Sequence, residues 1–99
     1  MRADGVLALA PECTISDIAP LQKGLTSLLE HPSSVTLDIE AVQRIDTAAM
    51  QMVAAFVRER ESHGRQVQWR GSAPVFGSAA RLLGLAPMLH LPDAADERS

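Results

Sequence analysis

The sequence predicts an α/β domain, and three observations indicate this fold class. Short apolar stretches of strand length alternate with longer stretches whose apolar residues recur at the spacing of one helix face. Glycine or proline stands where several of these stretches end, as is typical of turns and helix ends. The length of 99 residues and the apolar content of 46% suit one globular domain. Strands that alternate with helices need crossover connections, so we expect the strands to be at least partly parallel.

The first third of the chain predicts one strand and one helix. Residues 6–9 form a short apolar run that Pro11 closes, which is typical of a strand at the edge of a sheet. The following stretch has the spacing of a helix, with apolar residues at Ile18, Leu21, Leu25, Leu28 and Leu29. Either Ser16 or Thr14 is placed to cap this helix, and Pro32 ends it.

The middle third predicts a strand followed by the clearest helix of the chain. Residues 34–39 alternate apolar and polar side chains, which indicates a strand with one apolar face. Residues 48–63 have helical spacing, follow Asp46, which is able to cap a helix, and stop at Gly64. A short connection joins the two elements.

The last third predicts a third strand and a further helix. Residues 67–69 form the strand, and residues 74–83 form a helix that starts at a proline and has a glycine just past its end. Residues 85–91 add either one more helical turn or a strand. We therefore place the domain at residues 1–92 and a polar C-terminal tail at residues 93–99.

Composition and charge limit the partners and the location. The net charge is −3, and the nine Lys and Arg residues are scattered, whereas nucleic-acid binding needs grouped basic side chains. Cys13 is the only cysteine, which excludes an internal disulfide and indicates a reducing compartment. Residues 1–10 do not have the pattern of a signal peptide, and the apolar-rich run at residues 47–57 is shorter than the roughly 20 residues that span a bilayer. We therefore expect a cytoplasmic protein with no nucleic-acid partner and no direct membrane insertion.

The sequence shows no motif for catalysis, for a cofactor or for a metal. Its glycines are not clustered as in a phosphate-binding loop. The three histidines and Cys13 do not have the spacing of metal ligands. No serine stands in the strand–turn–helix context of a catalytic nucleophile. We expect a protein that is not an enzyme, with no catalytic residues, no cofactor and no metal.

One stretch joins a strand to a helix through a loop and carries an Asp-Thr pair at the junction. Leu-Asp-Ile at residues 37–39 ends the strand, and Arg-Ile-Asp-Thr-Ala-Ala-Met at residues 44–50 leads into the helix. This stretch resembles the family of sulfate-transporter and anti-sigma-factor-antagonist (STAS) domains. That family has a strand ending in Leu-Asp, a short loop, and then Asp-Ser or Asp-Thr followed by a small residue, Gly and Leu. The resemblance covers residues 34–91, including the strand at residues 67–69 and the helix that follows it.

The resemblance implies a mixed central sheet of about four strands with helices packed against it. It also implies a partner-switching role, in which the Ser or Thr after the Asp is phosphorylated or contacts the partner directly. At the matching positions this chain has Asp46 and Thr47. It departs from the family pattern by having Ala49 and Met50 in place of the Gly and Leu, and a threonine where the best-known switching members have serine.

The helix that follows Asp46 has two faces of different character at about 100° per residue. One face, which we expect to pack on the sheet, carries Ala49, Met50, Val53, Phe56, Val57 and Arg60. The other face carries Thr47, Ala48, Gln51, Ala54, Ala55 and Arg58. Small and mostly uncharged side chains allow a partner to approach closely, so we interpret the second face, with Asp46 beside it, as a partner-binding surface centred on Thr47. The alternative is that Asp46 and Thr47 only cap the helix.

Two functions agree with this interpretation. The first is a stand-alone regulatory domain of the anti-sigma-factor-antagonist type in bacterial signalling, either partner switching or chemotaxis-type. Its partner is a serine/threonine kinase-type anti-sigma factor or a histidine kinase, and phosphorylation of Thr47 controls the binding. The alternative is the small cytoplasmic subunit of a bacterial lipid-transport (lipid-asymmetry) ABC transporter, in which Thr47 contacts the ATPase without being phosphorylated. The identity of the neighbouring genes distinguishes the two.

Overall fold

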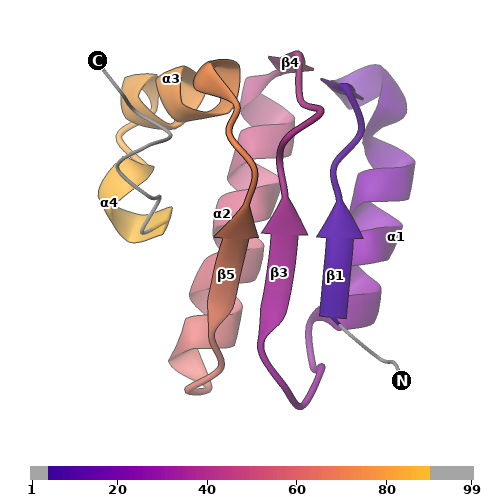
Figure 1. The fold of residues 1–99 in the computed structure, drawn as a ribbon, viewed down its shortest axis with the longest axis vertical. Coiled ribbons are helices and arrows are strands. Elements are labelled where there is room, and N and C mark those ends of the chain that lie inside the picture. Colours follow the sequence, from indigo (N-terminus) through magenta and orange to yellow (C-terminus); the bar gives the residue numbers. More distant parts are fainter. Residues whose placement is uncertain (1–4, 90–99) are drawn as a thin grey trace.

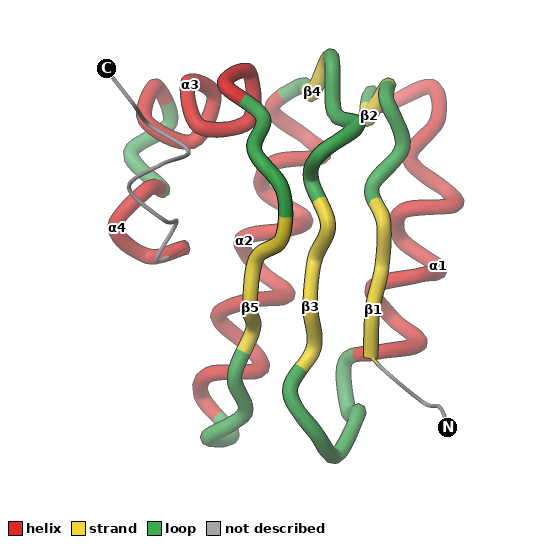
Figure 2. Tube along the Cα trace, in the orientation of Figure 1, coloured by secondary structure: helices red, strands yellow, loops and turns green. Residues whose placement is uncertain are grey.

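The computed structural model describes residues 5–89, which form an α/β fold (Figure 1). The main sheet has three parallel strands in the order β1-β3-β5. These strands are β1 (Gly5–Ala8), β3 (Val35–Asp38) and β5 (Val67–Arg70). A separate parallel ladder pairs β2 (Glu12–Cys13) with β4 (Arg44–Ile45), beyond the carboxyl ends of β1 and β3 (Figure 2).

The helices lie on one face of the sheet and beyond one of its edges. The 3-10 turn η1 (Ile15–Asp17) leads into α1 (Ile18–Leu28), and α2 (Thr47–Ser62) follows β4. Figure 1 shows α1 and α2 behind the strands, where they cover the same face. The shorter helices α3 (Pro74–Leu82) and α4 (Ala86–Leu89) lie on the side of β5, and both contact α2.

The expected α/β class is confirmed, and the two strands predicted at residues 34–39 and 67–69 are present as β3 and β5, which pair with each other. Every strand pair in the described part of the chain is parallel, whereas the family resemblance implied a mixed sheet of about four strands. The reason is that α1 and α2 each return the chain to the same end of the sheet, so β1, β3 and β5 run in one direction. The short strands β2 and β4 form their own ladder and do not extend the main sheet. In that sheet, β5 is therefore an edge strand.

The predicted ends of the last two long helices agree with the structure. Gly64 and Gly84 follow α2 and α3 with a φ of 72° at each, the left-handed conformation in which glycine commonly ends helices. The region after Gly84 contains the short helix α4, so the structure has the helical turn of the two alternatives predicted there, a turn or a strand. The end of that predicted turn and the predicted tail at residues 93–99, with the domain boundary at residue 92, lie outside the described residues.

The predicted cap of α1 is wrong. Neither Ser16 nor Thr14 caps this helix, because both lie in or next to the 3-10 turn that precedes it. Asp17 occupies the position before α1 but accepts no hydrogen bond there through its side chain. The helix also ends at Leu28, before Pro32.

The core lies between the sheet and the two long helices. It includes Val35 and Leu37 of β3 and Ile39 just after that strand, each with no exposed surface. The predicted buried face of α2 is confirmed, since all six of its residues are buried: Ala49, Met50, Val53, Phe56, Val57 and Arg60. A charged residue therefore belongs to the packed side of α2.

Arg60 is buried, with 1% of its surface exposed, and its guanidinium is surrounded by backbone carbonyl groups. Nη1 donates hydrogen bonds to the carbonyl oxygens of Leu28 at 3.3 Å and His31 at 2.8 Å. Nη2 donates to the carbonyl oxygens of Ser33 at 2.7 Å and Gln66 at 3.1 Å. One side chain of α2 thus holds the end of α1, the loop before β3 and the segment before β5.

Trp69 and Cys13 have structural roles. The indole Nε1 of Trp69 donates to the carbonyl oxygen of Leu89 at 2.9 Å, and its ring packs against Phe76 with the ring centres 5.4 Å apart. Cys13 is buried, and its Sγ donates to the carbonyl oxygen of Ala10 at 3.3 Å. Burial raises the pKa of the Cys13 thiol, which disfavours the reactive thiolate.

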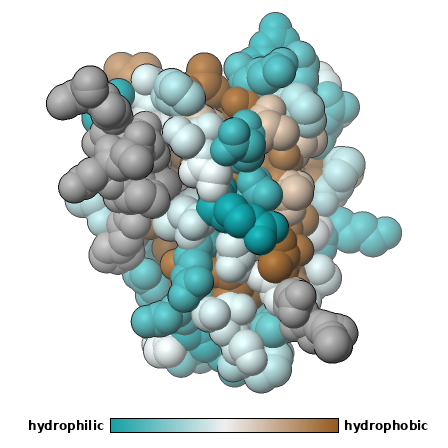
Figure 3. Space-filling model, in the orientation of Figure 1, coloured by the Kyte–Doolittle hydropathy of each residue, from teal (hydrophilic) through white to brown (hydrophobic). Residues whose placement is uncertain are grey.

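The face of the sheet opposite α1 and α2 has a polar centre. On this face the Asp38 carboxylate lies 3.3 Å from Nε of Arg70 on the neighbouring strand. Figure 3 shows this side of the molecule, with hydrophilic surface across its middle. No described helix is long and apolar enough to cross a membrane.

The turns that follow β3 and β5 are in close contact. Glu40 Oε1 accepts a hydrogen bond from the backbone N–H of Ser72 at 2.9 Å. Gly71, the residue before Ser72, has a φ of 87°. A Cβ atom at this position would lie 2.6 Å from Cβ of Glu40 and 2.8 Å from the backbone nitrogen of Glu40. Only glycine fits this turn without displacement of the neighbouring chain.

Candidate functional site

Asp46 caps the N-terminus of α2 and connects it to the segment before α1. Its Oδ1 accepts a hydrogen bond from the N–H of Ala49 at 3.0 Å, which is the bond expected of a helix cap. Its Oδ2 accepts a second bond from the N–H of Ile15 at 2.7 Å. The hydrogen bonds from Ala49 and then Ile15 lower the pKa of Asp46, so this carboxylate is charged at neutral pH.

Thr47 is the first residue of α2, and its side chain is exposed. Its hydroxyl group has no hydrogen-bond partner among residues 5–89, whereas the adjacent Asp46 uses both carboxylate oxygens. The capping role therefore belongs to Asp46. The Thr47 hydroxyl is left available at the surface, where it can donate one hydrogen bond and accept others.

The exposed side of α2 forms a narrow stripe that starts at Thr47. The stripe continues through Gln51, Ala55 and Arg58, all of which are exposed, and Ala48 at its margin is half-buried. Ala54 is the exception, because only 4% of its surface is exposed and it belongs to the core. The prediction that Ala54 lies on the exposed side is wrong. Besides the sheet, α2 packs against α1, α3 and α4, so its buried sector is wider than that of a helix packed on a sheet alone.

A groove between α1 and α2 runs beside this stripe and has a volume of about 360 Å³. Its apolar lining consists of Leu25, Leu29, Met52, Ala55 and Phe56. Its polar lining consists of Gln22, Thr26 and Glu59. Met52, which belongs to neither of the two helix faces defined from the sequence, lies in this groove.

Ile15 adds an apolar group to the same end of the molecule. Its surface is 63% exposed, and its N–H is the one bound by the Asp46 carboxylate. Sequence reasoning missed Ile15, because helical spacing alone does not reveal the 3-10 turn that presents it. Its exposure and its bond to Asp46, 31 residues away, leave no signal in the local sequence.

The surface has the chemistry of a docking site. It combines a free hydroxyl group at Thr47, an amide at Gln51, small side chains and an apolar groove, with one cation at Arg58 and one carboxylate at Glu59. In the part of the chain that the structure describes, no three His, Cys, Asp or Glu side chains are grouped as metal ligands. Low charge keeps the cost of removing water from such a surface small.

A protein-family model matches most of the chain. The family model described as "Mlab, STAS domain" matches residues 1–90 of the 99-residue chain. The match includes every element of the fold and the whole of the surface around Thr47. No curated protein is similar enough to the chain to count as a match.

Proposed function

The chain belongs to the STAS domain family, and from that premise we propose that it is a non-enzymatic, cytoplasmic domain that regulates a bacterial protein partner by docking. Membership of the family supports a protein-interaction or regulatory role. The observation that carries the proposal is the exposed, nearly uncharged stripe Thr47-Gln51-Ala55 beside the apolar groove between α1 and α2. The partner packs against a surface centred on Thr47, and this stripe is the part of that surface that α2 contributes.

The first candidate is a regulator of the anti-sigma-factor-antagonist type in partner switching or chemotaxis-type signalling. Its partner is a serine/threonine kinase-type anti-sigma factor or a histidine kinase. Phosphorylation of Thr47 adds about −1.5 to −2 charges at neutral pH. No basic side chain lies between Thr47 and Gln51 on this stripe to neutralise that charge. The phosphate therefore crowds the interface and releases the partner.

The second candidate is the small subunit of a lipid-transport ABC transporter, in which unmodified Thr47 contacts the ATPase. The family pattern has the same Asp before a phosphorylated residue, so the charged Asp46 carboxylate is compatible with both candidates. The free hydroxyl of Thr47 is suited to a direct hydrogen bond with a partner.

The test of docking is a calorimetric titration with the protein encoded beside this gene. Thr47→Glu should weaken binding at least tenfold, because a carboxylate in a close-packed interface costs about 2 kcal/mol or more. The same change should alter stability by less than about 1 kcal/mol, since the N-terminal end of a helix favours negative charge. Gln51→Arg should weaken binding as well, whereas Gln68→Arg, on the opposite face of the sheet, serves as the matched control. Unchanged affinity for both Thr47→Glu and Gln51→Arg would disprove the proposed surface.

Thr47→Ala distinguishes the two candidates. If the hydroxyl makes a direct hydrogen bond to an ATPase, its removal should weaken binding about as strongly as Thr47→Glu does. If the hydroxyl serves as a phosphate acceptor, Thr47→Ala should bind almost normally but resist release by the kinase. Mass spectrometry of the protein after incubation with the partner and ATP reports whether Thr47 is phosphorylated.

A further inference from the structure

The outer side of β1 is an unpaired sheet edge in the described residues. β1 pairs with β3 alone, and the N–H of Leu9 at its end donates inward to the carbonyl oxygen of Asp38 at 2.9 Å. Because backbone groups alternate in direction along a strand, those of Val6 and Ala8 point outward. Residues 5–10 contain no charged residue and no proline, the features with which proteins usually protect sheet edges. Val6 is 40% exposed, and Figure 3 shows hydrophobic surface over this strand.

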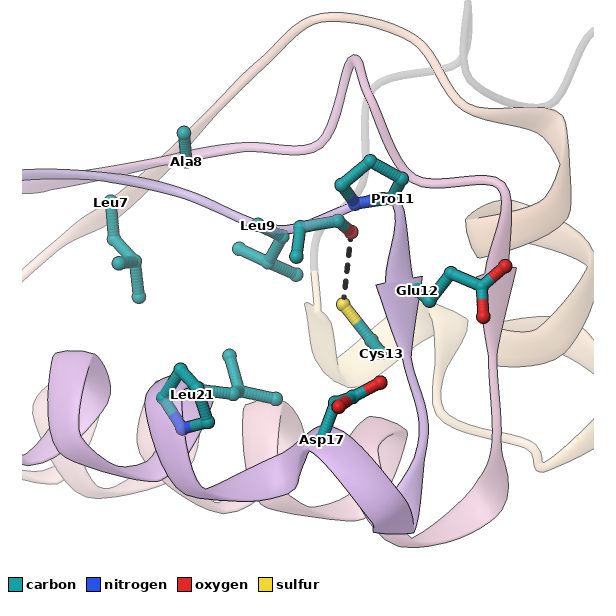
Figure 4. Close-up of a pocket in the computed structure, with 10 residues that line it drawn as sticks. Leu7, Ala8, Leu9, Pro11, Glu12, Cys13, Asp17 and Leu21 are labelled. Carbon is teal, nitrogen blue, oxygen red and sulfur yellow. Dashed lines mark hydrogen bonds between the residues drawn. The ribbon is translucent and has the colours of Figure 1, made fainter.

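A pocket of about 470 Å³ opens beside this edge, between the chain that continues from β1 and the start of α1 (Figure 4). Its apolar lining includes Leu7, Leu9, Pro11, Cys13, Pro20 and Leu21. Figure 4 shows Leu7 and Leu9 pointing toward α1, whereas Ala8 points away from it. A strand added at this edge would point every second side chain toward the α1 side of the sheet. The pocket lies on that side.

Two carboxylates, those of Glu12 and Asp17, also line the pocket. Oε1 of Glu12 lies 3.5 Å from Nη1 of Arg44. Both side chains are more than half exposed, so this ion pair is weak. The Asp17 carboxylate has no ion pair among residues 5–89. Within residues 5–89, the mouth of the apolar pocket thus carries a negative charge that no ion pair matches.

We propose that the outer edge of β1 and this pocket bind an extended peptide segment of a protein partner. The segment adds a strand to the sheet by hydrogen bonds with the backbone of Val6 and Ala8, a known mode of peptide recognition. One of its apolar side chains enters the pocket, and a neighbouring Lys or Arg pairs with Asp17. A second copy of this chain fits less well, because its own edge at residues 5–10 has no basic residue to offer. This proposal does not depend on the surface around Thr47.

The experiment uses a phage-displayed library of random twelve-residue peptides selected on the intact protein. Enriched peptides should alternate apolar and polar residues and carry Lys or Arg near a large apolar residue. A synthetic copy of the most enriched peptide should then bind Ala8→Pro at least about tenfold more weakly by calorimetry. Proline removes the outward N–H of Ala8 and is tolerated at sheet edges. Asp17→Asn should weaken binding by about threefold or more, whereas Glu30→Gln, which removes a carboxylate beyond the other end of α1, should leave it unchanged.

Ala10→Trp is a second variant in case Ala8→Pro fails to fold, as thermal melts would show. Ala10 is exposed and lines the pocket, so a large side chain there should block the apolar site while leaving the strand pairing in place. The proposal is overturned if no peptide is enriched, if the enriched peptides lack basic residues, or if they bind Ala10→Trp and Asp17→Asn as tightly as the wild type. The proposal is also overturned if light scattering shows that the wild type is a dimer and Ala8→Pro a monomer, because the dimer then forms through β1.

Discussion

At the scale of single residues, Asp46 links charge to stability. The hydrogen bonds from Ala49 and Ile15 stabilise its charged form, so its pKa in the folded protein lies below the ordinary value of 3.8. A carboxylate whose pKa is lowered on folding stabilises the protein fully above its unfolded-state pKa. That contribution is lost as the pH falls through the folded-state pKa.

We predict that Asp46→Asn destabilises the protein at pH 7, and that the difference from the wild type decreases below about pH 4. Asparagine keeps an acceptor oxygen for the cap but lacks the charge. Thermal melts of both proteins between pH 7 and pH 3 measure the difference. Asp17→Asn, which removes an exposed carboxylate without a capping bond, is the matched control and should change stability less at pH 7. A difference for Asp46→Asn that stays constant across this range would contradict the prediction.

Arg60 is the second residue with a large predicted effect. Burial, followed by repulsion from Arg65, lowers the pKa of Arg60, yet an arginine remains charged at neutral pH. Arg60→Met keeps the apolar contacts of the side chain but leaves the carbonyl groups of His31, Ser33 and Gln66 without their donor. We predict a loss of about 3 kcal/mol in the free energy of unfolding, measured with urea. Arg58→Met, at an exposed position of the same helix, should stay within about 0.5 kcal/mol of the wild type.

At the scale of elements, the turns provide a matched pair of glycines. Gly71 and Gly64 both have positive φ, but a Cβ at Gly71 would collide with Glu40, whereas nothing lies within 4 Å of a Cβ at Gly64. Gly64→Ala should therefore cost only the conformational strain of about 1 kcal/mol. Gly71→Ala should cost about 2 kcal/mol or more, because the turn after β3 must also move. Equal melting temperatures for the two variants would show that the contact with Glu40 relaxes freely.

The main elements could be predicted because each long stretch buries one regular face. Strand alternation gave β3, and helical spacing gave α1 and α2 to within a few residues. The ladder of β2 and β4 could not be found in this way, since two residues are too short to show any period. The 3-10 turn before α1 was missed for the same reason.

The surface around Thr47 was predicted only in part. The exposure of Thr47, Gln51 and Ala55 follows from the periodicity of α2 alone. The burial of Ala54 depends on how α2 packs among the other helices, and the groove depends on the contact between α1 and α2. Such contacts between elements leave no local pattern in the sequence.

At the scale of the whole molecule, the hydrogen bonds of Arg60 join segments that are distant in the sequence. Leu28, His31 and Ser33 lie between 27 and 32 residues before Arg60, and Gln66 lies six residues after it. No local stretch of chain can form this set of bonds. All of them require that α1, α2 and the strands that follow these helices have already taken their places.

The cage of carbonyl groups around Arg60 therefore has a consequence for the order of folding. Because its bonds need three assembled segments, we predict that they form after the rate-limiting step, so that Arg60→Met accelerates unfolding and barely changes the folding rate. Stopped-flow measurements in urea separate the two rates. If Arg60→Met mainly slows folding and barely changes the unfolding rate, Arg60 belongs to the folding nucleus instead. In the predicted order, the hydrogen bonds of Arg60 form late in folding, and their loss shortens the lifetime of the native state.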